Sequence, residues 1–169
     1  MQYTADQTLA ILMEGNRKFS SGTIAVQSFQ DAQQIMQADQ KPIAVILSCA
    51  DSRVLPEQIF SQGIGDIFVI RVAGNIAKPS QIGSIEYAVK QYDIPLVVVL
   101  GHSDCGAIAS TINACRDPNK VLPENLQQIV DDIKPTVIEV YENNKTAALD
   151  EISTLAIKEF EDATKCDDG

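Results

Sequence analysis

The chain has 169 residues, of which 45% are hydrophobic and 21% charged, values typical of a globular domain with a buried core. Its net charge of -10 provides no basic excess, which argues against nucleic acid and anionic membranes as partners. No segment resembles a secretory leader and no apolar run approaches the ~18 residues of a membrane span, so we expect a cytoplasmic protein without membrane contact.

The N-terminal part predicts helices. Thr4 begins the segment TADQ, in which Gln7 stands at the third position of a capping box. The apolar stripe expected on this helix consists of Leu9, Leu12 and Met13. A second, polar-rich helix is expected over residues 28–39, and the two helices together form an N-terminal arm over residues 1–40.

Three short, predominantly apolar runs follow, at residues 43–48, 67–72 and 96–101. Runs of this kind suit strands that are buried on both faces, as in a parallel sheet covered by helices. A short helix over 55–66, opened by Pro56 and closed near Gly63, separates the first two runs. A longer one over 79–94, with the apolar residues Ile82, Ile85, Tyr87 and Val89, separates the last two.

The rest of the chain predicts four further helices, at residues 107–115, 123–133, 134–144 and 149–165. The last should bury one face, made of Ile152, Leu155, Ala156 and Phe160. The sequence has no internal repeat or linker. We therefore expect a single α/β domain over 1–169, with a mostly parallel central sheet flanked by helices: the arm (1–40), a sheet core with the candidate metal site (41–115) and a helical C-terminal part (116–169).

Metal-binding side chains follow two of the predicted strands. Cys49 comes directly after the first strand, and His102, the single histidine of the chain, follows the third, with Cys105 three residues later. If the first strand is central, the carboxyl ends of these strands meet at one crevice. Two sulfurs and one imidazole suit tetrahedral zinc and argue against magnesium, calcium or manganese.

The segment after Cys49 adds a carboxylate and a cation, Asp51 and Arg53. Asp51 could fill a fourth metal position, or it could pair with Arg53 and stay ionised as a hydrogen-bond acceptor. The alternative is a buried structural cysteine beside an ordinary ion pair at a strand end. The coincidence of all five residues at two strand ends favours a functional site.

These residues also resemble a known family. The segments CADSR (49–53) and GHSDCGA (101–107) are similar to the two signature motifs of the β-class carbonic anhydrases, and the similarity extends over roughly residues 4–140. The intervening segments GDIFVIRVAGN (65–75) and GSIEYAV (83–89) also resemble that family. The resemblance implies an α/β zinc enzyme that interconverts carbon dioxide and bicarbonate, with one Zn²⁺ per chain, and works as a homodimer or a higher even-numbered oligomer.

By position, Cys49, His102 and Cys105 resemble the permanent zinc ligands of that family, and Asp51 with Arg53 resembles its catalytic pair. In the family this aspartate either occupies the fourth zinc position or pairs with the arginine. The residues that match substrate-pocket positions are Gln40, Phe68, Ala73, Tyr87 and Gly106. The implied mechanism is attack of zinc-bound hydroxide on carbon dioxide.

The chain departs from the family pattern at several points. It ends where members usually continue, so we expect a shorter C-terminal part, and Ala50 replaces a usual serine. The chain has no tryptophan, so the non-catalytic bicarbonate site of some members is not expected. Cys115 should lie in a helix core, and Cys166 should be a thiol of the tail. Two alternatives stay open: hydrolysis of carbonyl sulfide or carbon disulfide on the same scaffold, and a catalytically silent zinc-binding regulatory protein.

Overall fold

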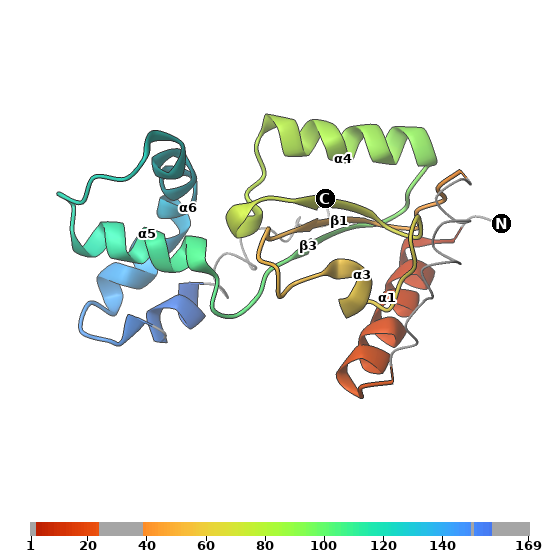
Figure 1. Ribbon diagram of the computed structural model, residues 1–169, viewed down its shortest axis with the longest axis horizontal. Coiled ribbons are helices and arrows are strands. Elements are labelled where there is room, and N and C mark those ends of the chain that lie inside the picture. The colour runs from red at the N-terminus through yellow and green to blue at the C-terminus, as the bar shows by residue number, and fades with distance from the viewer. Residues whose placement is uncertain (1–2, 24–38, 150, 157–169) are drawn as a thin grey trace. The chain divides into compact units, whose positions relative to one another are not determined.

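The computed structural model describes residues 3–23, 39–149 and 151–156 (Figure 1). The described elements in chain order are α1 (Ala5–Ser20), β1 (Val45–Ser48), α3 (Pro56–Ile59), β2 (Phe68–Arg71), the 3-10 turn η1 (Ala73–Asn75), α4 (Pro79–Tyr92), β3 (Val97–Leu100), α5 (Gly106–Arg116) and α6 (Glu124–Asn143). Residues 151–156 are also helical. The helix predicted over 28–39 lies, apart from its last residue, outside the described residues.

The three described strands form one sheet in the order β2-β1-β3, so the first strand is central, as predicted. The Val72 N–H donates to the Ser48 carbonyl oxygen (3.0 Å), and the Val72 carbonyl accepts from the Ala50 N–H (3.2 Å). One residue that bonds to two residues flanking its neighbour is the pattern of parallel strands. The predicted α/β fold with a parallel sheet is therefore confirmed.

Burial differs between the strands. Every residue of β1 is buried, whereas β2 is only half-buried and β3 begins at the exposed Val97. The prediction that all three strands are buried on both faces is wrong for β2 and β3. Among the described residues these are the outer strands of the sheet, and they lack the second neighbour that encloses β1.

The chain divides into two compact units, which we describe separately. The first comprises residues 1–47, 52–70 and 77–98, and the second comprises 48–51, 71–76 and 99–169. In the first unit, Figure 1 shows α4 on one side of the strands and α1 with α3 on the other. A cluster of Val45, Ala88 and Ile94 forms part of its core.

Helix α1 begins with the predicted capping box. The Gln7 N–H donates to Thr4 Oγ1 (3.2 Å), and the Thr4 N–H donates to Gln7 Oε1 (2.9 Å). The predicted apolar stripe, however, is wrong, because Leu9 and Met13 are 47% and 53% exposed and only Leu12 is buried.

The buried face of α1 instead consists of Thr8, Leu12 and Gly15. A Cβ atom at Gly15 would lie 1.7 Å from the Phe60 carbonyl oxygen, so only glycine allows this approach. Close backbone packing decides which face is buried here, and hydrophobicity does not.

Helices α3 and α4 begin as predicted, each with proline in its first turn. Helix α3 ends at Ile59, before the expected stop near Gly63, and Ser61, two residues after its end, has a φ of 48°. Helix α4 ends at Tyr92, before Pro95, with Asp93 in the left-handed conformation. The apolar residues predicted for α4 are not all in the core, because Ile82 and Tyr87 are exposed.

In the second unit, α6 is one helix where the sequence predicts two, over 123–133 and 134–144. Pro135 lies inside the helix, and Val130, Ile133 and Val137 are buried before and after it. Ile133 and Val137, on either side of Pro135, belong to the same buried cluster as Ile108, and this burial offsets the hydrogen bond that proline removes.

The end of the described chain also contributes to this core. Ile152 and Ala156 are buried as predicted, whereas Leu155 is exposed. Cys115 of α5 is only half-buried. The predicted core residue Phe160 and the tail thiol Cys166 lie outside the described residues.

Candidate metal centre

Three metal-binding side chains meet in the second unit. The Sγ atoms of Cys49 and Cys105 and a ring nitrogen of His102 all lie within 4.8 Å of one another. In tetrahedral zinc, bonds of about 2.0–2.3 Å place ligand atoms roughly 3.5–3.8 Å apart. The three side chains therefore need to close by no more than about 1.3 Å to hold zinc. The juxtaposition predicted from the two strand ends is confirmed.

The ring of His102 is oriented by its own backbone neighbourhood. Nδ1 lies 2.8 Å from the Ser103 carbonyl oxygen, and a carbonyl can only accept, so we place the proton on Nδ1. The other nitrogen, Nε2, is buried and has no hydrogen-bond partner among the described protein atoms. Its lone pair is therefore left for a ligand, and metal-binding histidines commonly have this arrangement.

Cys105 stands at the start of α5, after a tight turn in which Asp104 has a φ of 56°. Burial raises the pKa of its thiol, the backbone N–H of Ile108 opposes this rise, and the neighbouring Cys49 adds to it. Two adjacent thiolates are unfavourable without a compensating cation. A bound metal ion would supply this compensation and deprotonate both thiols.

Close packing around η1 supports the site. Gly74 has a φ of 69°, and a Cβ atom there would lie 2.7 Å from Ile133 Cδ1 and 3.1 Å from Ala107 Cβ. Ala107 is in the first turn of α5, two residues after Cys105. Gly74 therefore lets η1 approach the helix that carries one of the three ligands.

Sequence reasoning missed Arg71, the last residue of β2. Its Nε donates to the Cys49 carbonyl oxygen (2.9 Å), and its Nη2 donates to the Asp51 carbonyl oxygen (2.5 Å). The guanidinium thus binds the backbone on both sides of Ala50. The signal in the sequence was a charged residue inside the apolar run IFVIRV, a position at which arginine requires specific partners.

The remaining predicted site residues divide between the two units. Asp51, two residues after Cys49, is half-buried and belongs to the second unit. Arg53 is exposed and belongs to the first unit. Their pairing stays a prediction. Ala73 and Gly106 belong to the second unit, the former in η1 and the latter as the first residue of α5.

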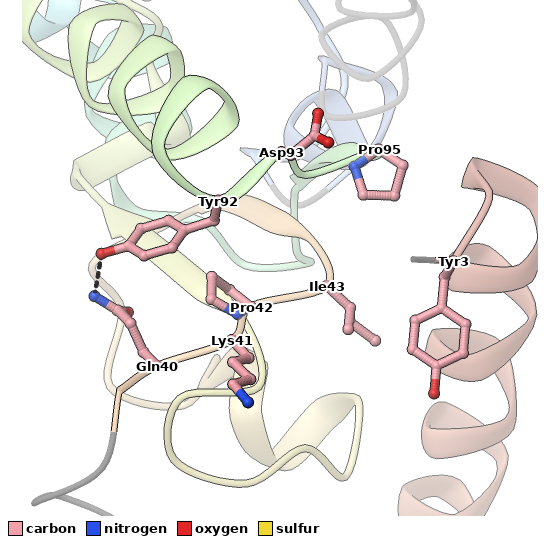
Figure 2. Close-up of a pocket in the computed structure, with 8 residues that line it drawn as sticks. All are labelled: Tyr3, Gln40, Lys41, Pro42, Ile43, Tyr92, Asp93 and Pro95. Atoms are coloured by element: carbon pink, nitrogen blue, oxygen red, sulfur yellow. Dashed lines mark hydrogen bonds between the residues drawn. The ribbon is translucent and has the colours of Figure 1, made fainter. Parts of the chain in front are cut away.

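Gln40, Phe68 and Tyr87 lie in the first unit. Figure 2 shows the Gln40 amide directed at Tyr92, where Nε2 donates to the phenolic oxygen at 2.7 Å. These two residues line a cavity of about 630 Å³. The Phe68 and Tyr87 rings contact each other with centroids 6.4 Å apart, and Tyr92 packs against both. A substrate-binding role for these residues is not tested by these contacts.

The described helices include none with both the length and the apolar character needed to cross a bilayer. Fold and site together define a class: an α/β protein with a sheet of parallel strands and a metal-binding set of two cysteines and one histidine. Such a set is typical of zinc proteins in which a fourth position stays open.

Comparison with known proteins agrees with this class. The family profile described as carbonic anhydrase matches residues 44–164. Carbonic anhydrase 2 of Mycobacterium tuberculosis is 44% identical over 129 residues, which is 75% of this chain and 61% of that protein. The carbonic anhydrase of Mycolicibacterium smegmatis is 40% identical over 129 residues, covering 75% and 62% of the two chains.

Among solved structures, the β-carbonic anhydrase CcaA has a TM-score of 0.63 at 29% identity, over 89% of this chain and 74% of its own. The β-carbonic anhydrase CafA of Aspergillus fumigatus, with a TM-score of 0.65 over 88% and 69% of the two chains, is 22% identical and shows the fold alone. The chain belongs to the carbonic anhydrase family, and its fold is that of the β class. It spans about three fifths of the length of the mycobacterial relatives.

Proposed function

We propose that this protein is a zinc-dependent carbonic anhydrase that interconverts carbon dioxide with bicarbonate and a proton. The observation that carries the proposal is the meeting of Cys49, His102 and Cys105 within 4.8 Å, with the Nε2 atom of His102 left without another partner. Family membership supports this particular activity for the site, because the mycobacterial relatives are named carbonic anhydrases.

In this proposal Cys49, His102 and Cys105 hold one zinc ion per chain. Zinc in a site of this kind lowers the pKa of a bound water from ~15.7 toward ~7 and so supplies hydroxide at neutral pH. The two cysteines provide two negative charges and His102 provides a neutral nitrogen. The three ligands would therefore neutralise the ion, which could still bind a water molecule.

Asp51 is the proposed proton acceptor and orienting group. It lies two residues beyond Cys49, in the same unit as the three ligands. As a carboxylate, Asp51 can accept a hydrogen bond from a water molecule at the metal site. That bond would orient the water so that a lone pair of its oxygen points toward the carbon of the substrate. Arg53 is the proposed partner that keeps Asp51 ionised and away from the fourth position.

The proposed substrate pocket combines apolar and polar groups. Carbon dioxide has no net dipole, so the Phe68 ring and the Ala73 methyl group suit it, with Gln40 and Tyr87 as further wall residues. Gly106 is the first residue of α5, and its N–H has no acceptor within the helix. That N–H is the proposed donor to an oxygen of bicarbonate.

A homodimer is the proposed working unit, and the cytoplasm the proposed location. Three hydrophobic side chains of the first unit, those of Ile82, Tyr87 and Val97, are exposed, and in this proposal a second copy covers them. The β-carbonic anhydrases of Sordaria macrospora are described as tetrameric. Analytical ultracentrifugation tests the assembly, and a monomer at micromolar concentration contradicts it.

Stopped-flow hydration of carbon dioxide by the full chain, with zinc measured on the same sample, tests the activity. We expect one zinc per chain, a rate far above that of buffer, loss of the rate after chelation and its return with zinc. One zinc per chain with no acceleration overturns the enzyme and points to a silent zinc-binding protein. Hydrolysis of carbonyl sulfide or carbon disulfide without hydration of carbon dioxide overturns the assignment of carbon dioxide as the substrate.

A further inference from the structure

We propose that Arg71 is a positioning residue of the metal centre, fixing the backbone that carries Cys49 and Asp51. The inference rests on the proposed function, since it assigns a task to Arg71 at the same site. It concerns how the chain holds a ligand and a carboxylate in register.

The four consecutive residues from Ser48, the last of β1, to Asp51 are each hydrogen-bonded to Arg71 or to Val72, the residue that follows β2. The backbone of Val72 donates to the Ser48 carbonyl and accepts from the Ala50 N–H. The side chain of Arg71 donates to the two carbonyls between and beyond these, at Cys49 and Asp51. The backbone of Val72 makes the sheet bonds, while the other two bonds depend on the arginine side chain.

The planar guanidinium suits this task. The Cys49 and Asp51 carbonyls are two residues apart, and Nε and Nη2 form two donors of one rigid fork that reaches both. With both carbonyls held, rotation of the peptide groups that follow Cys49 and Asp51 is restricted. The directions of the Cys49 thiol and the Asp51 carboxyl then follow from the backbone.

The charge of Arg71 serves the same site. Two thiolates and the Asp51 carboxylate carry three negative charges against the two positive charges of zinc. Arg71 is half-buried, so its charge is less screened than that of a surface residue.

The test measures zinc affinity by competition with a chromophoric chelator, together with the visible spectrum of the cobalt(II)-substituted protein. The variants are Arg71→Gln and Arg71→Lys. Arg116→Lys is the matched control, because Arg116 also donates to a backbone carbonyl, that of Ala147 (2.9 Å), in the same unit. The unfolding of each metal-free protein is measured in parallel.

We expect Arg71→Gln to weaken zinc binding ~10–100-fold, the usual effect of losing a group that orients a metal ligand. Its cobalt spectrum should change, because the geometry of the ligands changes. Arg71→Lys should recover part of the affinity, since an ammonium keeps the charge but cannot span both carbonyls. Arg116→Lys should match the wild type in affinity and spectrum.

Zinc affinity within about twofold of wild type and unchanged cobalt spectra in both Arg71 variants overturn the inference. If an Arg71 variant is less stable than the wild type without metal but binds zinc with the same affinity, the role of Arg71 is merely structural. That result also overturns the inference. If Arg71→Gln does not fold, Arg71→Lys decides by the same criteria, and failure of both to fold counts against the inference. Absence of zinc binding by the wild type instead overturns the proposed function.

Discussion

The Nδ1 atom of His102 lies 2.8 Å from the carbonyl oxygen of Ser103, and this one contact determines what the imidazole can do. With the proton on Nδ1, the lone pair is on Nε2, which is buried and without a hydrogen-bond partner among the described residues. An unsatisfied buried polar atom costs about 1–3 kcal/mol. A metal ion that accepts this lone pair therefore also removes an unfavourable term from the folded state.

The two cysteines near His102 should be required for zinc, and a cysteine elsewhere should not. We expect Cys49→Ser to lower zinc affinity by more than the ~10–100-fold that the loss of an orienting group costs, because a thiolate ligand is removed outright. Cys115→Ser is the matched control from α5 in the same unit. Zinc per chain after dialysis, measured by elemental analysis, distinguishes them. Full zinc retention by Cys49→Ser would contradict the ligand set.

Asp51 should be required for the rate and dispensable for zinc. We expect Asp51→Asn to keep its metal and lose ~10²–10⁴-fold in hydration rate, because an amide cannot accept the proton. The control is Asp131→Asn, an exposed carboxylate of α6 that accepts from Gln127 (2.8 Å). Stopped-flow rates and zinc content are measured on both. Loss of zinc in Asp51→Asn would show that this carboxylate is a ligand in the resting protein.

The metal-free protein should lose stability at alkaline pH. Burial raises the pKa of the Cys105 thiol above its ordinary 9.0, so the folded chain binds this proton more tightly than the unfolded chain. The stabilisation is complete below the pKa of the unfolded chain and is lost as pH rises through the folded pKa. The unfolding temperature of the metal-free protein should therefore decrease above about pH 9.

The contribution of the Cys115 thiol has to be excluded by substitution, because burial also raises its pKa. We therefore compare Cys115→Ser with the double variant that adds Cys105→Ala. The decline of the unfolding temperature should be smaller in the double variant. Bound zinc should also reduce the decline, because it holds Cys105 deprotonated. Equal declines in the two variants would show that other groups cause it.

Two glycines should respond to alanine in opposite directions. Gly15→Ala should destabilise by about 1–3 kcal/mol, because the new methyl group would meet the Phe60 carbonyl oxygen. Gly83→Ala, inside α4 and with open space around the position of a Cβ atom, should stabilise by about 0.5–1 kcal/mol. Urea unfolding of each variant measures the difference. An unaffected Gly15→Ala would mean that α1 does not pack on α3 as described.

Sequence patterns predicted the frame of the protein well. Three apolar runs became three strands, and the first strand proved central, which brought Cys49 next to His102 and Cys105. The errors concern burial and continuity: α1 buries Gly15 in place of Leu9 and Met13, and α6 continues through Pro135. Each error arose because packing against another segment outweighed the local preference.

The sequence by itself determined the local features: the capping box at Thr4, the proline starts of α3 and α4, the three strands and the identities of the candidate metal ligands. These depend on interactions within a few residues, or on chemical type alone. Tertiary structure decided which atoms meet. The free lone pair on His102 Nε2 depends on burial by the folded chain, and the bonds of Arg71 to Cys49 and Asp51 join segments some twenty residues apart. No periodic pattern in the sequence predicts hydrogen bonds of this kind, since they form only when the sheet aligns the two strands.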